Sequence, residues 1–128
     1  MLTIHEVVNQ YPNISRNGLD WRYAESLDEM NMHTVWTVVD WLDTFTRVET
    51  PVVSSYSLKH VAEKSMRLAF ENDPEIGDTL IARYVANGEL IMAAAILEIP
   101  QKQIGINTLV AISKAEYMEA RDMVGGFA

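Results

Sequence analysis

The chain has 128 residues, of which 48% are hydrophobic and 22% are charged, and it contains no cysteine. This length suits one domain with one buried core, and the composition is that of a globular protein, which excludes an intrinsically disordered chain. The lack of cysteine excludes disulfides, zinc sites built on thiolates and a thiol nucleophile. The formal net charge of −8, without any run of Lys and Arg, argues against direct nucleic-acid binding.

Neither secretion nor membrane insertion has a signal in the sequence. The N-terminal stretch MLTIHEVVNQYPN lacks the basic start and the apolar segment of a signal peptide. The longest apolar run, Leu90 to Leu97, is only eight residues long. A membrane-spanning helix needs about 20. We therefore expect a cytoplasmic protein without membrane contact.

The first half of the chain predicts helices joined by polar segments. Thr3 and Glu6 form the pattern of a capping box and open a short helix that Pro12 ends. Residues 12–19 predict a turn-rich connection, and residues 20–33 a short acidic helix. A longer helix begins at Thr34 and continues to the segment 49–51. Its buried stripe comprises Val35, Val38, Val39, Leu42 and Phe45.

Two further helices are expected before residue 87. One begins at Ser55 or Ser57 and runs to Phe70. Its core face would be Leu58, Val61, Ala62, Met66, Leu68 and Ala69, and its solvent face Lys59, His60, Glu63, Lys64 and Arg67. The other helix begins at the pair Asp73-Pro74, with Asp as the cap, and ends at Val85 or Ala86.

The Asn87-Gly88 pair predicts a corner between two helices, because Gly favours a left-handed backbone and Asn caps helices. The following helix, about 88–98, is apolar on nearly all sides, which is typical of a central helix surrounded by others. Residues 104–112 favour a short strand or hairpin. Ser113 and Glu116 form another capping box, opening a last helix that Gly125-Gly126 ends.

Three segments resemble a group of small uncharacterised proteins of bacteria, their phages and plasmids. They are SSYSLKHVAEK (54–64), RYVANGELIMAAAI (83–96) and GINTLVAISK (105–114). The matching residues are Ser55, Tyr56, Leu58, Lys59, His60, Glu63, Tyr84, Val85, Asn87, Gly88, Ile91, Ala93, Ala94, Gly105, Asn107, Ile112 and Ser113. Aliphatic Leu90 and Val110 and a C-terminal end without net charge depart from the group's pattern. The resemblance implies a mobile-element origin and no particular chemistry.

His60, Glu63 and Arg67 lie three and four residues apart on one predicted helix, so their side chains can touch. One interpretation makes His60 a general base that Glu63 orients. The other is a solvated helix face with a Glu63–Arg67 ion pair.

Trp36 falls outside the apolar stripe of its helix, at helical intervals from Asp40, Asp43 and Arg47. An exposed Trp beside carboxylates is a candidate docking point for a basic or cationic partner. The alternative is that the acidic segment 20–33 covers the indole.

Other chemical signatures are missing from the sequence. His5, His33 and His60 are isolated, and no His-Glu-x-x-His motif, calcium loop, phosphate loop or nucleophile elbow occurs. The helix after Asn87-Gly88 has no basic group with which to read DNA bases. We therefore expect no metal and no cofactor.

These observations predict a mainly α-helical fold, a single-domain bundle over residues 1–128 around a central apolar helix, with a possible β-strand or hairpin near residues 104–112. The leading hypothesis is a non-catalytic interaction protein of a phage or other mobile element. It would act in the bacterial cytoplasm and bind a basic host or phage protein through an acidic surface. The candidate partner-binding residues are Trp36, Asp40, Asp43, His60, Glu63 and Arg67.

Two alternatives stay open. One is an acidic inhibitor that imitates nucleic acid and blocks a host nuclease or defence complex. The other is a small enzyme that uses His60 and Glu63. A homodimer is compatible with either, and with the leading hypothesis.

Overall fold

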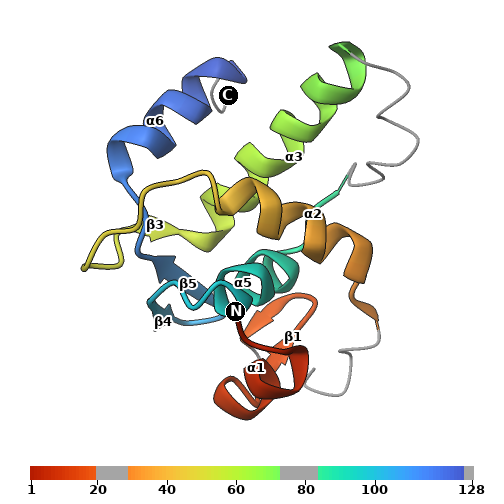
Figure 1. Cartoon of the computed structure of the whole chain (residues 1–128), viewed down its shortest axis with the longest axis vertical. Helices are drawn as coiled ribbons and strands as arrows, with labels where there is room; N and C mark the ends of the chain where they lie inside the picture. Colours follow the sequence, from red (N-terminus) through yellow and green to blue (C-terminus); the bar gives the residue numbers. More distant parts are fainter. Residues whose placement is uncertain (20–28, 73–83, 126–128) are drawn as a thin grey trace.

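The computed structural model describes residues 1–19, 29–72 and 84–125, and only the backbone of residues 70–72. Its helices are α1 (Ile4–Gln10), α2 (Met32–Leu42), α3 (Ser55–Asn72), α5 (Asn87–Ile96) and α6 (Lys114–Met123). Its strands are β1 (Ile14–Ser15), β2 (Gly18–Leu19), β3 (Val53–Ser54), β4 (Gln101–Ile104) and β5 (Asn107–Val110). Figure 1 shows α5 in the middle, with α2 and α3 above it, α1 and β1 below it, and the β4–β5 hairpin beside it.

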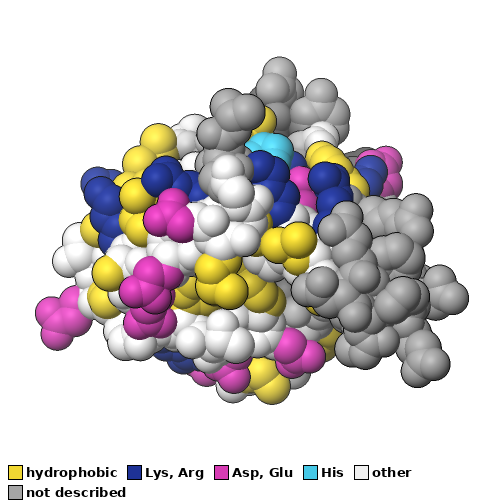
Figure 2. Space-filling model, turned by 90° about the horizontal axis from the view of Figure 1, so that it is seen from above, with side chains coloured by type: hydrophobic (Ala, Val, Ile, Leu, Met, Phe, Trp, Pro, Cys, Tyr) yellow, Lys and Arg dark blue, Asp and Glu magenta, His cyan; other side chains and the backbone are white. Residues whose placement is uncertain are grey.

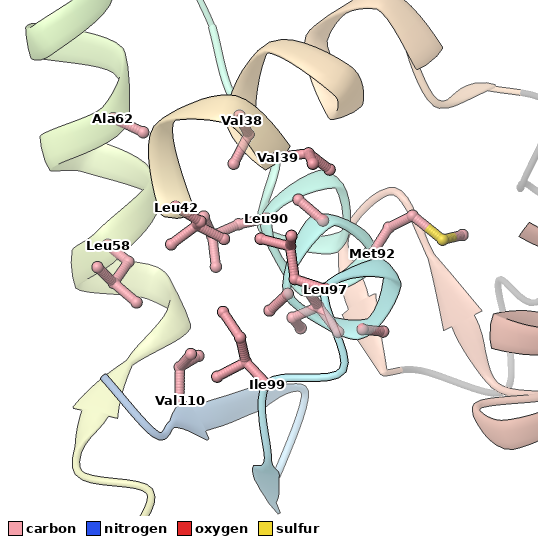
Figure 3. Packing of buried hydrophobic residues seen from close by; sticks show 14 of the residues in the cluster. Val38, Val39, Leu42, Leu58, Ala62, Leu90, Met92, Leu97, Ile99 and Val110 are labelled. Carbon is pink, nitrogen blue, oxygen red and sulfur yellow. The ribbon is translucent and has the colours of Figure 1, made fainter. Parts of the chain in front are cut away.

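The centre of the fold is α5, because every one of its ten residues is buried. Helices α1, α2 and α3 and strands from both sheets contact it. Figure 3 shows the packing around it, with side chains directed inward from α2 (Val38, Leu42), α3 (Leu58, Ala62) and β5 (Val110). The prediction that the apolar run forms a central, fully surrounded helix is confirmed. Burial of this apolar surface is the main favourable contribution to folding.

The prediction of a mainly α-helical bundle is wrong, because the described residues form two antiparallel sheets as well as five helices. Strands β1 and β2 pair with each other, and β3, β5 and β4 form a three-stranded sheet in that order. The fold is therefore mixed α/β. The strands β1, β2 and β3 have two residues each, too few to show the alternation by which a strand is recognised in a sequence.

The hairpin expected near residues 104–112 is present over residues 101–110. Its turn contains Gly105, whose φ of 61° lies in the left-handed region that favours glycine. The sequence did not predict that β5 would also pair with β3, with Val53 opposite Val110. Because this pairing joins segments far apart in the chain, no local pattern could reveal it.

The boundaries of α2 differ from the prediction at both ends. The helix begins at Met32, where Asn31 Oδ1 accepts a hydrogen bond from Thr34 N at 3.2 Å. It ends at Leu42, well before the segment 49–51. The five apolar residues predicted as its buried stripe are all buried, although Phe45 lies beyond the end of the helix.

Two of the predicted capping boxes lie within the described residues. At α1 the box is complete, with Thr3 N donating to Glu6 Oε1 at 3.1 Å and Glu6 N donating to Thr3 Oγ1 at 3.2 Å. At α6 only half of the box forms, because Ser113 Oγ accepts from Glu116 N while Glu116 Oε1 accepts from Thr46 N at 2.9 Å. The side chain of Glu116 therefore joins α6 to the loop after α2.

Two predicted helices lie wholly or mostly outside the described residues. They are the acidic helix within 20–33, of which 20–28 are not described, and the helix from Asp73, of which 73–83 are not described. The segment 12–19, predicted as a turn-rich connection, contains the β1–β2 pair.

Candidate functional site

Lys59 and Glu63 of α3 are buried, with 5% and 6% exposure, although the helical pattern predicted both on the solvent face. Glu63 Oε1 accepts a hydrogen bond from Val85 N at 2.8 Å, and Lys59 Nζ donates to Val85 O at 3.2 Å. The two side chains also contact each other at 3.5 Å. The prediction failed because the segment before α5 needs partners for its buried backbone groups, and α3 supplies them with charged side chains.

Two tyrosine rings lie near the Lys59 ammonium. Its nitrogen is 4.7 Å from the centroid of the Tyr84 ring and 5.5 Å from that of Tyr56. Both tyrosines are more than half exposed. A cation at these distances from aromatic rings is stabilised by their quadrupoles, so the rings partly replace the water that Lys59 has lost.

Asn87 joins four parts of the chain through its side chain. Its Oδ1 accepts from Ser55 Oγ at 2.8 Å, and its Nδ2 donates to Asn107 Oδ1 at 2.8 Å. The same Nδ2 lies 3.3 Å from the backbone oxygens of Asn17 and Ile106. The predicted role of Asn87 as a helix cap is wrong, because it is the first residue of α5 and Ala86 occupies the cap position.

Gly88 is needed for a reason that the sequence did not reveal. Its φ is not positive, so the left-handed corner predicted here is absent. A Cβ built on Gly88 would instead overlap the backbone carbonyl of Ser15. The nitrogen of Gly88 donates to Arg16 O at 2.9 Å, which holds the β1–β2 turn against the start of α5.

These groups surround a cavity of about 290 Å³, which we call the Lys59 pocket. The residues that line it are Asn17, Tyr56, Lys59, Tyr84, Asn87, Ile106 and Asn107. They come from the β1–β2 turn, the first turns of α3, the segment before α5, α5 itself, and the β4–β5 turn together with the start of β5. The three segments that carry the resemblance therefore meet at one place. Tyr56, Lys59, Tyr84, Asn87 and Asn107 belong to these segments, but no local pattern could predict a site there, because their proximity depends on the tertiary fold.

His60 and Glu63 contact each other, as their spacing predicted, with His60 Nδ1 3.5 Å from Glu63 Oε2. The His60 ring also meets Tyr56 edge to face, with the centroids 4.7 Å apart. Arg67, which lies one helical turn after Glu63, is exposed. The structure thus brings His60 and Glu63 together at the buried edge of α3, where Glu63 also holds Val85.

Trp36 is 43% exposed on the outer surface of α2. Asp40 is exposed on the same helix, and Asp43, which caps the C-terminal end of α2, is exposed and pairs with Arg47 at 3.4 Å. Both partners of this ion pair are well exposed, so it adds little to the free energy of folding. We call Trp36, Asp40 and Asp43 the α2 surface.

The whole molecule is acidic, but its charges are mixed locally. Figure 2 shows basic and acidic side chains together on the face seen from above. In the part of the chain that the structure describes, no group of three His, Asp or Glu side chains could hold a metal ion. None of the described helices is both long and apolar enough to cross a bilayer.

Comparisons of this chain with protein-family models, with curated proteins and with solved structures give no match. The candidate sites therefore depend on their geometry alone.

Proposed function

We propose that the protein is a non-catalytic interaction protein that binds a basic protein partner through the α2 surface. The observation that carries the proposal is the exposure of Trp36, at 43%, beside two exposed carboxylates. Burial of an exposed indole against a partner is favourable, because it removes apolar surface from water. Trp is also enriched in interface hot spots.

Charge complementarity indicates the kind of partner. The chain has a formal net charge of −8. Within the described residues Asp40 forms no ion pair, and the pair of Asp43 with Arg47 is exposed and weak. A basic surface could form ion pairs with both carboxylates. The electrostatic attraction of the acidic protein would also increase the rate of association with such a partner. We also propose that the protein acts in the cytoplasm of a bacterial host and originates from a phage or other mobile element. This part of the proposal is supported by the resemblance of three segments to small proteins of bacteria, phages and plasmids.

The test is capture from a bacterial lysate on the immobilised protein at low and high salt. The captured protein is identified, purified and titrated against the parent and the variants. Trp36→Ala should weaken binding by about tenfold or more, as a hot-spot residue does. Asp40→Asn should mainly slow association and reduce its salt dependence. Val52→Ala removes side-chain atoms from a residue with the same 43% exposure elsewhere and is the matched control.

Capture of no basic protein, or equal affinity of the parent and Trp36→Ala, would contradict the proposal. Measuring the molar mass of the free protein in the same buffers shows whether a homodimer is the species that binds. Nucleic-acid mimicry would need a row of carboxylates, whereas the α2 surface offers two, Asp40 and Asp43. The proposal therefore does not include mimicry of nucleic acid.

A second candidate, a small enzyme, is favoured by the 3.5 Å contact between His60 Nδ1 and Glu63 Oε2. In that case His60 would act as a general base that Glu63 orients. Chromogenic esters and phosphate esters are suitable first substrates. His60→Ala should abolish any turnover and leave partner binding by the α2 surface unchanged, whereas turnover that survives His60→Ala would exclude this role.

A further inference from the structure

Five oxygens at or beside the Lys59 pocket already accept hydrogen bonds from the protein. Asn87 Oδ1 accepts from Ser55, Asn107 Oδ1 accepts from Asn87, and Val85 O accepts from Lys59. The backbone oxygens of Asn17 and Ile106 accept from Asn87. A ligand donor could still share these oxygens through their second lone pairs, but none of them lacks a partner, whereas donors beside them do.

The side chains of Lys59 and Asn107 have N–H groups that these bonds do not use. An ammonium group has three N–H bonds, and the two described contacts of Lys59 Nζ, to Val85 O and Glu63 Oε1, leave one for a ligand. The amide NH₂ of Asn107 has no hydrogen-bond partner within residues 1–19, 29–72 and 84–125. Both residues line the same cavity.

A second cation lies beside the pocket. The Arg16 guanidinium is 5.5 Å from the centroid of the Tyr84 ring, which is also the ring nearest to Lys59. The Nε of Arg16 is buried and has no hydrogen-bond partner among the described residues. Two cations, Lys59 and Arg16, thus lie against the Tyr84 ring, although the chain as a whole has a formal net charge of −8.

We infer that the Lys59 pocket binds the oxyanion group of a small ligand, either a carboxylate or a phosphate. Lys59 supplies the charge, and the Asn107 amide donates a directed hydrogen bond to one of the oxygens. The rings of Tyr56 and Tyr84 form walls against which a flat part of the ligand packs. A volume of about 290 Å³ fits a ligand of one ring and one anionic group. This site is separate from the α2 surface, so either can fail without the other.

The experiment is a titration of the ¹⁵N-labelled protein, followed by backbone and side-chain amide chemical shifts. The probes are inorganic phosphate, acetate, phenyl phosphate and benzoate, with neutral benzamide as the control ligand. We expect shifts centred on Asn107, Tyr84 and Asn87, and a Kd between about 10 µM and 1 mM for a ring-bearing anion. Whether phenyl phosphate or benzoate binds more tightly distinguishes the two oxyanions.

Lys59→Met should weaken binding by about tenfold or more, because it removes the charge but keeps a side chain of similar length. Lys114→Met makes the same change at an exposed lysine of α6 and should bind like the parent. If Lys59→Met does not fold, Tyr84→Ala decides, because that ring is 55% exposed and its loss should weaken the ring-bearing anions more than phosphate.

Three results would overturn the inference. The first is the absence of shifts in the pocket with any anion up to about 10 mM, a concentration that detects millimolar affinity. The second is equal binding of benzamide and benzoate. The third is unchanged affinity in a folded Lys59→Met variant or, where that variant does not fold, in Tyr84→Ala.

Discussion

The backbone carbonyl of Ser15 occupies the space into which a Cβ on Gly88 would project. We therefore predict that Gly88→Ala lowers the free energy of unfolding by about 3 kcal/mol or more, because backbone on both sides must shift. Gly105→Ala is the matched control. Its position has open space and a positive φ, so only backbone strain of about 1 kcal/mol is expected. Urea unfolding monitored by circular dichroism measures both, and equal losses would contradict the steric argument.

Removal of Glu63 should be among the most destabilising changes in α3. Glu63→Ala leaves Val85 N–H without its partner and Lys59 buried without a counter-charge, which costs about 3–5 kcal/mol. Glu63→Gln should cost less, because its oxygen can still accept from Val85. Asp43→Ala breaks an exposed ion pair and should change stability by about 0.5 kcal/mol or less. If Glu63→Ala and Asp43→Ala lowered the free energy of unfolding equally in denaturant titrations, the buried contacts of Glu63 would not contribute to stability.

Asn87 must be an amide, because its Nδ2 faces three oxygen acceptors. Asn87→Asp places a carboxylate oxygen against them, and we expect a loss of about 3 kcal/mol or more from repulsion and lost donors. Asn17→Asp is the control, because Asn17 contributes its backbone oxygen and its side chain is exposed, so a change of about 0.5 kcal/mol or less is expected. Thermal unfolding compares the two, and a stable Asn87→Asp protein would show that the network is dispensable.

Hydrogen bonds from the side chain and the backbone N–H of Thr46 lower the pKa of Glu116 below its ordinary value of 4.5. A depressed pKa in the folded state means that this contribution to stability is present above pH 4.5 and is lost as the pH falls through the folded pKa. Unfolding free energies measured from neutral to acid pH should therefore fall less steeply for Glu116→Gln than for the parent. An NMR titration in which the Glu116 carboxyl has its midpoint at or above 4.5 would refute this assignment.

Some elements were predictable because their signals are local. The capping box of Thr3 and Glu6, the apolar stripe of α2 and the apolar run of α5 each depend on residues within a few turns of one another. Hydrophobic burial makes such patterns reliable, since a helix that is apolar on all sides is stable in water only when other elements surround it. The central position of α5 follows from this reasoning.

The candidate pocket depended on contacts that no local pattern contains. Helical periodicity placed Lys59 and Glu63 outside, but the peptide groups of Val85 require partners in the interior. Asn87 and Gly88 have the composition of a turn, yet their roles come from Asn107 and Ser15, far away in the chain. The strands β1, β2 and β3 exist because the chain folds them against α3, α5 and β5.

The sequence by itself determined which segments are apolar enough to form the core, where α1 and α6 start, and that the molecule is acidic and free of thiol chemistry. Only the tertiary structure decided that charged and amide side chains would enter that core and form a pocket at the junction of five segments. The physical reason is that burial of apolar groups follows from each residue's own chemistry, whereas a buried polar group is tolerated only where distant partners complete its hydrogen bonds.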